Sequence, residues 1–379
     1  MSGEVVISGV GLWKPEHRIT NEELVSSYNA WAERYNAEHQ QAIARGECAA
    51  KPLSSAEFIE KASGISSRYA YVKDGILDVT RMRPRIPHRA EDELSHQAEI
   101  ALNAARPALA AAGRLNPDGS AAEVDMVIVS CAYTERSYPA IAIEVQHALG
   151  ILGFGFDMLV ACSAATFALQ RAVDAIKAGS ANAVLVINPE LTSPQVNYTD
   201  RDSHFIFGDV STAVVLERAE AAVGQHRYQV LGSKAQTLYS NNIRSNFGYV
   251  ARAEDTDPFG TPNLFHQNGR KVFKEVCPMA AEHLESQIAS QGLTTTDVKR
   301  WWLHQANLNM NQLIVRRLLG RDASQQEAPV VLNEFANTAS AGSIIAFCLH
   351  HQDLEAGDHG VICSFGAGYS IGSLVVRKL

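Results

Sequence analysis

Cys162 is the residue whose sequence surroundings point most directly to chemistry. It follows a short apolar segment, 156–160, that predicts a strand, and it precedes residues 163–178, whose alanine-rich composition predicts a helix. Gly179 comes just after that run, where a helix end favours a residue without a Cβ. A thiol at the N-terminus of a buried helix should have a lowered pKa, which makes it a nucleophile. Because free cysteine is also commonly buried for packing alone, position by itself leaves a structural role open.

Two polar residues in the second half of the chain could act with this thiol. His304 follows the strand-like segment 300–303 and lies in the run Leu-His-Gln-Ala-Asn-Leu-Asn. Asn337 lies in 333–343, where it could equally be an ordinary helix cap or turn residue. A histidine at a strand end is likewise often structural, so both roles stay open at this point.

A glycine-rich turn, 364–372, follows the predicted strand 360–364 and reads Ser-Phe-Gly-Ala-Gly-Tyr-Ser-Ile-Gly. Such a turn could cradle a phosphate, or it could present backbone N–H groups to an oxyanion. Its spacing does not match the dinucleotide-binding pattern G-x-G-x-x-G, so we expect no dinucleotide site.

Alternating strands and helices must position these residues. Buried strands alternate with helices along the chain, which predicts an α/β fold with helices layered on both faces of the strands. The first half has a predicted helix at 93–112 and strands at 5–11, 125–132, 156–160, 183–187 and 213–216; the second half has a helix at 279–290, strands at 300–303, 329–332 and 360–364, and a helix from about Ser343.

The order of elements in the second half repeats that of the first. Strand 156–160 with Cys162 matches strand 329–332 with Asn337, and each is followed by a helix and a further strand at nearly equal spacing. We therefore predict two pseudo-symmetric halves, 1–222 and 223–379. The first carries the cysteine and an extra polar segment near 28–53, and the second carries the histidine and asparagine.

Composition excludes several classes of protein. The chain has 379 residues, 46% of them hydrophobic, and a net charge of −8, which argues against general nucleic-acid binding. No apolar run is long enough to span a membrane, and the start of the chain does not resemble a signal peptide. Six cysteines without a C-x-x-C pair indicate a reducing cytoplasm. His350, His351 and His359 lack ligand-like neighbours, so we expect surface histidines and no metal site.

Four ordered motifs resemble a known family. Val-Ala-Cys-Ser-Ala-Ala-Thr-Phe around Cys162, Leu-His-Gln-Ala-Asn-Leu-Asn-Met around His304, Phe-Ala-Asn-Thr-Ala-Ser-Ala-Gly-Ser around Asn337, and Phe-Gly-Ala-Gly-Tyr-Ser-Ile-Gly-Ser near the end resemble the thiolase-fold condensing enzymes. The resemblance is to β-ketoacyl-acyl carrier protein (ACP) synthase III and runs from about residue 4 to the C-terminus. It implies a layered αβαβα fold. Asn337 separates this group from relatives that have a second histidine, a second cysteine or a glutamate base.

The resemblance implies a mechanism. Cys162 would attack an acyl-CoA thioester and hold the acyl group, with the backbone N–H groups of Cys162 and Ala367 holding the oxyanion. His304 and Asn337 would then bind the malonyl thioester carbonyl of malonyl-ACP and stabilise the enolate that forms as CO2 leaves. Acyl-CoA and malonyl-ACP are substrates, and no cofactor is expected. The implied assembly is a homodimer.

Departures from the family pattern concern the substrate's carrier and chain length. Phe58 stands where the family has an indole that stacks on the CoA adenine, and Ala62 where it has an arginine, whereas Arg201 matches the arginine on the other side of that site. The arginine usual after the His-Gln-Ala-Asn-Leu motif is Asn309 here. The family's Gly-Asp-Gly-Ala-Gly run is 208–212 here, Gly-Asp-Val-Ser-Thr, and the middle glycine of the terminal loop is Ala367.

The resemblance also suggests partner contacts. Lys274 and Arg316 align with the family's carrier-protein docking positions and lie in two basic runs that also include Arg270, Lys271, Arg317 and Arg321. Ordinary solvated surface is the alternative for both runs. Tyr138 aligns with the residue that closes the acyl pocket of the neighbouring subunit. Together with the extra segment and the changes at Phe58 and Ala62, this favours a primer longer than acetyl, in the medium-chain range.

Three other functions remain open from the sequence. A thiolase-fold acyltransferase would pass the acyl group to oxygen or nitrogen, but intact His304 and Asn337 favour condensation. A polyketide or secondary-metabolite condensing enzyme would use the same residues. A silent partner subunit would usually lose its nucleophile, and Cys162 is present.

Overall fold

The computed structural model describes residues 3–248, 250, 253, 255, 257 and 260–379. Residues 1 and 2, part of the start of the chain considered above, lie outside this description. The strands are β1 (Val5–Trp13), β2 (His17–Thr20), β3 (Ser67–Ala70), β4 (Met126–Cys131), β5 (Phe154–Leu159), β6 (Ala183–Glu190), β7 (Val210–Arg218), β8 (Tyr228–Ser240), β9 (Ile243–Arg244), β10 (His266–Gln267), β11 (Val298–Leu303), β12 (His359–Gly366) and β13 (Gly368–Lys378). The α-helices are α1 (Asn21–Glu38), α2 (Gln40–Ala44), α3 (Ala56–Ser63), α4 (His96–Ala111), α5 (Ile141–Ala148), α6 (Ala164–Ala178), α7 (Gly269–Ser290), α8 (Leu308–Leu319), α9 (Leu332–Phe335) and α10 (Gly342–Leu349).

Within the described residues, nine strands form one mixed sheet in the order β11-β12-β13-β8-β1-β7-β6-β4-β5. The strands from the first part of the chain lie on one side of the β1–β8 junction and those from the last part lie on the other. That junction is short, because Val6 pairs with Gln229 and Ile7 with Tyr228. The sheet therefore consists of two parts, called blades below, that are joined only by this short pairing. One contains β1, β7, β6, β4 and β5, and the other contains β11, β12, β13 and β8.

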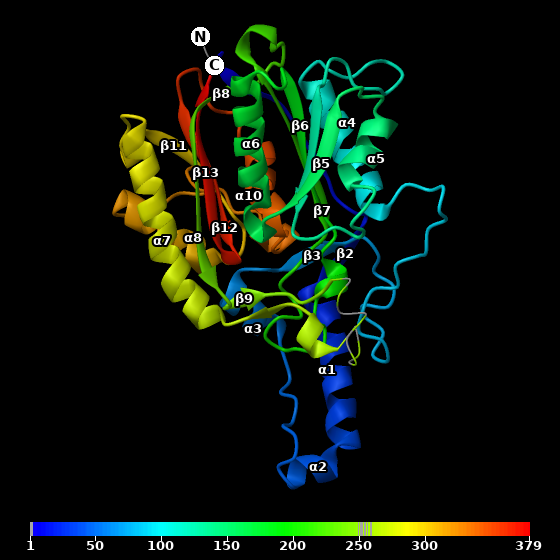
Figure 1. The fold of residues 1–379 in the computed structure, drawn as a ribbon. Helices are drawn as coiled ribbons and strands as arrows, with labels where there is room; N and C mark the ends of the chain where they lie inside the picture. The colour runs from blue at the N-terminus through cyan, green and yellow to red at the C-terminus, as the bar shows by residue number, and fades with distance from the viewer. Residues whose placement is uncertain (1–2, 249, 251–252, 254, 256, 258–259) are drawn as a thin grey trace.

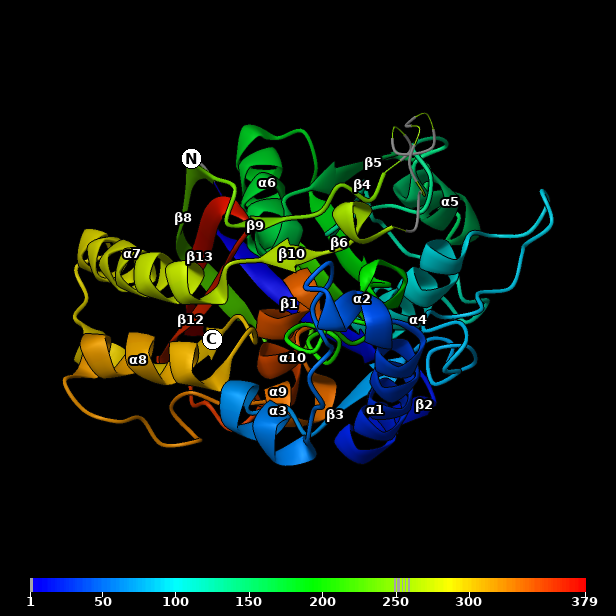
Figure 2. The same cartoon turned by 90° about the horizontal axis from the view of Figure 1, so that it is seen from below.

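Five layers result, as Figure 1 and the perpendicular view in Figure 2 show. Helices α4 and α5 cover the outer face of the β4–β7 blade, and α7 and α8 cover the outer face of the β11–β13 blade. Helices α6 and α10 lie between the blades, where α6 contacts both β6 and β13. The central core joins side chains from both blades, such as Ile128 and Trp302, to side chains of the helices between them, such as Leu169 on α6 and Phe347 on α10. This is the layered α/β thiolase-like fold predicted from the sequence.

Most predicted elements are confirmed, with shifted ends. Helix α6 ends at Ala178, and Gly179 takes a left-handed φ of 78° there, as predicted. Helix α7 begins ten residues before the predicted start at 279, because the helix continues through Pro278 to an N-cap at Asn268. Pro278 lies inside the helix, which continues on both sides of it.

The predicted strand at 329–332 is wrong. The backbone N–H groups of Val331 and Leu332 donate to Oε1 of the Gln305 side chain, at 3.0 and 3.2 Å, instead of to a neighbouring strand. Leu332 then begins the short helix α9. Among the described residues, the second blade consequently has no strand equivalent to β5.

The matching of Cys162 to Asn337 in the two repeats is also corrected. Ala161 and Ala339 both have a left-handed φ, of 45° and 47°, and each begins a short 3-10 turn that leads into α6 or α10. Ser340 therefore takes the place of Cys162 in the second repeat. The division of the chain at 222/223 stays a prediction.

The extra segment near 28–53 forms a projecting hairpin. Helix α1 extends well away from the body, α2 turns the chain, and residues 45–54 return toward α3 (Figure 1). Thr20 and Glu23 form a reciprocal capping box that fixes the start of α1. Residues 72–92 form a long loop that contains no helix or strand.

Candidate active site

Cys162 lies in a tight turn between β5 and α6. Ala161, which precedes it, has a φ of 45°, a left-handed conformation that alanine rarely adopts. Gly366 packs directly against the cysteine. A Cβ built on Gly366 would lie 2.5 Å from Cβ and 3.0 Å from Sγ of Cys162. The absence of a side chain at Gly366 therefore lets the end of β12 approach the thiol closely.

His304 lies just beyond the end of β11, as predicted. Its backbone N–H donates to the carbonyl of Cys363 at 2.8 Å, and its ring contacts Phe365 edge-on, with centroids 5.3 Å apart. The side chain is buried, and Nδ1 finds no hydrogen-bond partner among the described residues. Burial lowers the pKa of His304 to about 3, so the imidazole is neutral at working pH.

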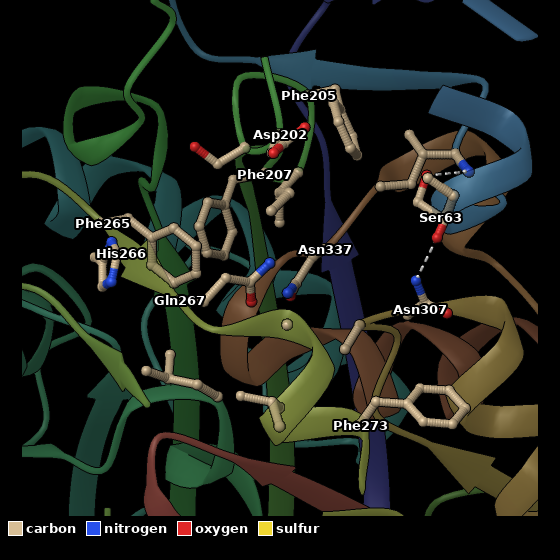
Figure 3. Close-up of a pocket in the computed structure, with 18 of the residues that line it drawn as sticks. Ser63, Asp202, Phe205, Phe207, Phe265, His266, Gln267, Phe273, Asn307 and Asn337 are labelled. Atoms are coloured by element: carbon tan, nitrogen blue, oxygen red, sulfur yellow. Dashed lines mark hydrogen bonds between the residues drawn. The ribbon is translucent and has the colours of Figure 1, made fainter. Parts of the chain in front are cut away.

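Asn337 is held by its own backbone and by the turn that follows it. Its N–H donates to Ile206 at 2.9 Å, and its carbonyl accepts from Gly208 at 3.1 Å. Its side-chain Oδ1 accepts the N–H of Ala339 at 2.9 Å. This bond orients the amide so that Nδ2 remains available as a donor. Figure 3 shows the side chain directed toward the space between the lining residues.

These three side chains, which lie far apart in the sequence, line one cavity of about 980 Å³. Much of its wall is apolar, with aromatic side chains from several elements: Phe58, Phe205, Phe207, Phe265 and Phe273 (Figure 3). A thiol, an imidazole and a carboxamide thus share one cavity with room for an acyl chain. This arrangement suits attack on a thioester followed by stabilisation of an enolate.

The expectation of a lowered cysteine pKa is wrong. Burial, and then the negative charge of Glu190, raise the pKa of the Cys162 thiol to about 12. Hydrogen bonds from the backbone N–H groups of Ala367 and of Cys162 act in the opposite direction without overcoming this effect. Desolvation is the largest of these effects, because a thiolate at this position would lose hydrating water.

Glu190, at the end of β6, is the residue that the sequence analysis missed. Its carboxylate is fully buried, and its Oε1 accepts the N–H of Ala132 at 3.2 Å, the N–H of Ser340 at 3.0 Å and the hydroxyl of Ser340. Burial raises the pKa of Glu190 to about 7. A charged residue at the end of the continuous apolar run Ala183–Ile187 was the available signal.

Comparison with known proteins decides the family. Models for 3-oxoacyl-[acyl-carrier-protein (ACP)] synthase III match residues 156–237, and its C-terminal model matches residues 288–378. The chain is 54% identical, over 354 residues, to the beta-ketodecanoyl-[ACP] synthase of Pseudomonas aeruginosa, covering 93% of this chain and 100% of that protein. The chain belongs to the β-ketoacyl-ACP synthase III family.

Further relatives of this synthase agree. It is 30% identical over 379 residues to the β-ketoacyl-ACP synthase III of Rhodospirillum centenum, covering 98% of both chains. The solved 3-oxoacyl-ACP synthase III of P. aeruginosa PAO1 shares the fold, with a TM-score of 0.74 and 22% identity over 99% of this chain and 98% of that one. The resemblance recognised from the four motifs is confirmed, and the chain is a condensing acyltransferase.

Two of the predicted substrate-binding residues, Phe58 and Arg201, contact each other beside the cavity. The guanidinium of Arg201 stacks on the ring of Phe58, 3.7 Å from its centroid, and its Nε donates to the carbonyl of Leu53 at 2.7 Å. Phe58 and Ala62 line the cavity itself. The structure thus brings Phe58 and Arg201 together, and their contact with substrate stays a prediction.

The remaining predicted site residues lie on the surface of the synthase. Tyr138 is 85% exposed, in the loop before α5, and is not among the described residues that line the cavity. Lys274 is exposed on α7, and Arg316 is exposed on α8 in an ion pair with Asp322 at 2.5 Å. In the described part of the chain, no helix is long and apolar enough to cross a membrane. The same residues contain no cluster of side chains that could hold a metal ion.

Proposed function

We propose that this synthase loads a medium-chain acyl group from acyl-CoA onto Cys162 and condenses it with malonyl-ACP to give a β-ketoacyl-ACP. The single observation that carries the proposal is the shared cavity. Cys162, His304 and Asn337 line it together with several phenylalanine side chains. The reaction needs no cofactor, because decarboxylation of the malonyl group supplies the carbanion.

The first step forms the acyl-enzyme. Sγ of Cys162 attacks the thioester carbonyl, the C–S bond to CoA breaks, and the thiol proton leaves with the CoA sulfur. The oxyanion of the tetrahedral intermediate accepts hydrogen bonds from the N–H groups of Cys162 and Ala367. The direction of the Ala367 N–H toward the Cys162 sulfur supports this role.

The second step forms the carbon–carbon bond. Loss of CO2 from the malonyl group leaves an electron pair on carbon, delocalised as an enolate whose oxygen accepts hydrogen bonds from the neutral imidazole of His304 and from Nδ2 of Asn337. The enolate carbon attacks the acyl-Cys162 carbonyl. The C–S bond then breaks, and the cysteine sulfur takes up a proton. Two neutral donors without a strong base suit a reaction in which no proton is removed from carbon.

The proposed primer is octanoyl. The relative that is 54% identical is named for a β-ketodecanoyl product, and a ten-carbon product requires an eight-carbon primer plus two malonyl carbons. The side chains of Phe205, Phe207 and Phe273 give the cavity the apolar wall that such a chain needs. Each buried CH2 contributes ~0.8 kcal/mol, so kcat/KM should rise steeply from acetyl to octanoyl.

Mass spectrometry of the intact protein tests this proposal. Wild type and Cys162→Ala are mixed with acetyl-, butyryl-, octanoyl- and decanoyl-CoA, and the acyl adduct is located by peptide mapping. We expect the fastest adduct formation with octanoyl-CoA, on Cys162, and none on the variant. A maximum at acetyl with octanoyl inert would overturn the medium-chain primer, and an adduct on Cys162→Ala would overturn the nucleophile.

An acyltransferase that passes the acyl group to oxygen or nitrogen is the alternative. It would form the same acyl-enzyme without consuming malonyl-ACP. Release of CO2 from malonyl-ACP by the octanoylated synthase therefore separates the two functions.

We propose further that the synthase is a two-fold dimer joined along β5. This strand ends the sheet order and exposes three large apolar side chains, Phe154, Phe156 and Leu159, at 48%, 37% and 55%. An edge strand of this kind needs a cover, and antiparallel pairing with a second copy would supply it symmetrically. Because α5 packs on β5, Tyr138 just before α5 would then lie near the partner subunit. The family homology supports a role for Tyr138 in closing the partner's cavity.

A further inference from the structure

The projecting hairpin of α1, α2 and residues 45–54 is held in a fixed position beside the catalytic cavity. Asn36 exchanges two hydrogen bonds with the backbone of Lys51, at 3.0 and 2.8 Å, and Asn29 exchanges two with the backbone of Ser54, at 3.1 and 2.8 Å. The two asparagines lie seven residues apart on α1, which places them on one face of the helix. These four hydrogen bonds fix the returning chain against the helix.

The body of the synthase also holds the base of the hairpin. Arg201 donates to the carbonyl of Leu53 at 2.7 Å, and the hydroxyl of Tyr28 donates to the carbonyl of Pro52 at 3.0 Å. Segment 51–54 is therefore ordered from both sides. As a result, the side chain of Lys51 is presented at a defined place on the wall of the cavity.

Lys51 is a cation without a carboxylate partner. Its ammonium lies 5.3 Å from the ring centroid of Tyr35 and 5.9 Å from that of Trp31, two aromatic rings that attract a cation without neutralising it. Among the residues that the structure describes, no carboxylate forms an ion pair with Lys51. The lysine is thus held near the cavity mouth with its charge available.

The acidic residues at the same mouth are already engaged. Asp202 lies 3.5 Å from the guanidinium of Arg201, and Asp200 accepts the hydroxyl of Ser203 and the N–H of Asp202. A second cation, Arg270, lines the cavity as well. With Lys51, Arg201 and Arg270, three cations face these two carboxylates, and the local excess of positive charge suits an anionic ligand.

We propose that Lys51 binds a phosphate group of the thioester carrier and is a specificity-determining residue of this synthase. The inference rests on the proposed function, because acyl-CoA and phosphopantetheinyl ACP both present a pantetheine chain whose far end carries phosphate. With its thioester at Cys162, such a carrier must leave its phosphate outside, where the hairpin stands. An ammonium suits this task because it is a compact charge with three donors.

Substrates with and without phosphate test the proposal. Lys51→Met keeps the length of the side chain and removes its charge, and Lys61→Met, at an exposed position on α3 outside the described cavity lining, is the matched control. Acylation of Cys162 is measured with octanoyl-CoA and with octanoyl-pantetheine, which has no phosphate. We expect Lys51→Met to raise KM for octanoyl-CoA about tenfold, the size of one hydrogen bond to a charged group, and to leave octanoyl-pantetheine unchanged.

Malonyl-ACP identifies the source of the phosphate. If Lys51→Met raises only the KM for malonyl-ACP, Lys51 binds the phosphate of the carrier protein. If it raises only the KM for octanoyl-CoA, Lys51 binds a phosphate of CoA. Equal losses with octanoyl-CoA and octanoyl-pantetheine, or no change with any donor, would overturn the proposal. Lys51→Arg should restore most of the affinity, and equal melting temperatures for the variants would exclude a folding defect.

Direct binding separates this inference from the proposed function. Calorimetry with free CoA and free pantetheine needs no reaction, so it reports on Lys51 even if Cys162 were not acylated. We expect wild type to bind CoA more tightly than pantetheine, and Lys51→Met to lose that difference. An undiminished preference for CoA in the variant, together with an unchanged KM for malonyl-ACP, would overturn the role of Lys51.

Discussion

After burial, the negative charge of the Glu190 carboxylate is the main cause of the raised pKa of the Cys162 thiol. Glu190 is fully buried and Cys162 is only partly exposed, so the charge is screened less than it would be at the surface. The same carboxylate accepts a hydrogen bond from the N–H of Ala132, which follows β4. It accepts another from the N–H of Ser340, which precedes α10. One buried acid thus joins the nucleophile's surroundings to the turn that follows Asn337.

Replacing Glu190 with glutamine should make Cys162 more reactive. Oε1 carries the hydrogen bonds to Ser340, so the amide oxygen of Glu190→Gln can keep them while the negative charge is lost. We expect alkylation of Cys162 by iodoacetamide at pH 8 to become severalfold faster, because the thiolate is no longer opposed by the carboxylate. An unchanged or slower rate, with melting temperature preserved, would contradict this coupling.

The reactivity of Cys162 should rise steadily with pH. Its pKa is raised to about 12. At every pH well below that value, the thiolate fraction increases about tenfold for each unit by which the pH rises. Alkylation rates measured from about pH 6 to pH 9 should rise throughout, with a shallower slope near pH 7, where Glu190 becomes charged and opposes the thiolate. A plateau near neutral pH would mean that the thiol is already ionised in the resting enzyme.

Decarboxylation should depend on the donor of Asn337 and not on the shape of its side chain. Asn337→Asp keeps the hydrogen bond accepted from Ala339 but replaces the Nδ2 donor with an oxygen. We expect CO2 release from malonyl-ACP to fall by about 10²–10³, the effect of losing one oxyanion donor, with acylation of Cys162 retained. Equal loss of both half-reactions would argue against this role.

The pH profile of the same half-reaction tests His304. Because burial lowers the pKa of His304 to about 3, its imidazole is neutral from about pH 5 to pH 8, and decarboxylation should show no inflection from this residue in that range. His304→Ala should lose decarboxylation and retain acylation. An inflection near the ordinary histidine pKa that disappears in the variant would show that the charged form takes part.

Charge reversal on the surface should distinguish the two predicted docking residues. Arg316 is already paired with Asp322, whereas Lys274 forms no ion pair among the described residues, so Lys274→Glu should raise KM for malonyl-ACP more than Arg316→Glu at low salt. Acylation by octanoyl-CoA should be unchanged in both. An unchanged KM for malonyl-ACP in both variants at low salt would remove this face as the docking site.

The exposed edge of β5 provides a test of assembly. Phe156→Lys places a charge in the proposed interface, and light scattering after size-exclusion chromatography should show a shift from dimer to monomer. Tyr138→Ala should leave the dimer intact and move the preferred acyl chain length upward if Tyr138 closes the partner's cavity. A wild-type monomer would exclude both ideas.

The sequence by itself determined the family, the α/β class and the positions of the three chemical residues. Cys162, His304 and Asn337 each lie in a local motif, and the strand, turn and helix around Cys162 follow from local composition, so short-range rules were sufficient to find them. The alternation of strands and helices likewise predicted the layered arrangement.

Tertiary structure decided what depends on groups far apart in the chain. The side chain of Gln305 replaced the strand predicted at 329–332, and the combined burial of Cys162 and nearby Glu190 reversed the expected pKa shift. The place of Lys51 at the cavity mouth depends on hydrogen bonds from α1 and on the packing of the body against the hairpin. Solvation and electrostatic fields depend on every group nearby in space, and the local motif therefore predicted the reactive thiol but not its environment.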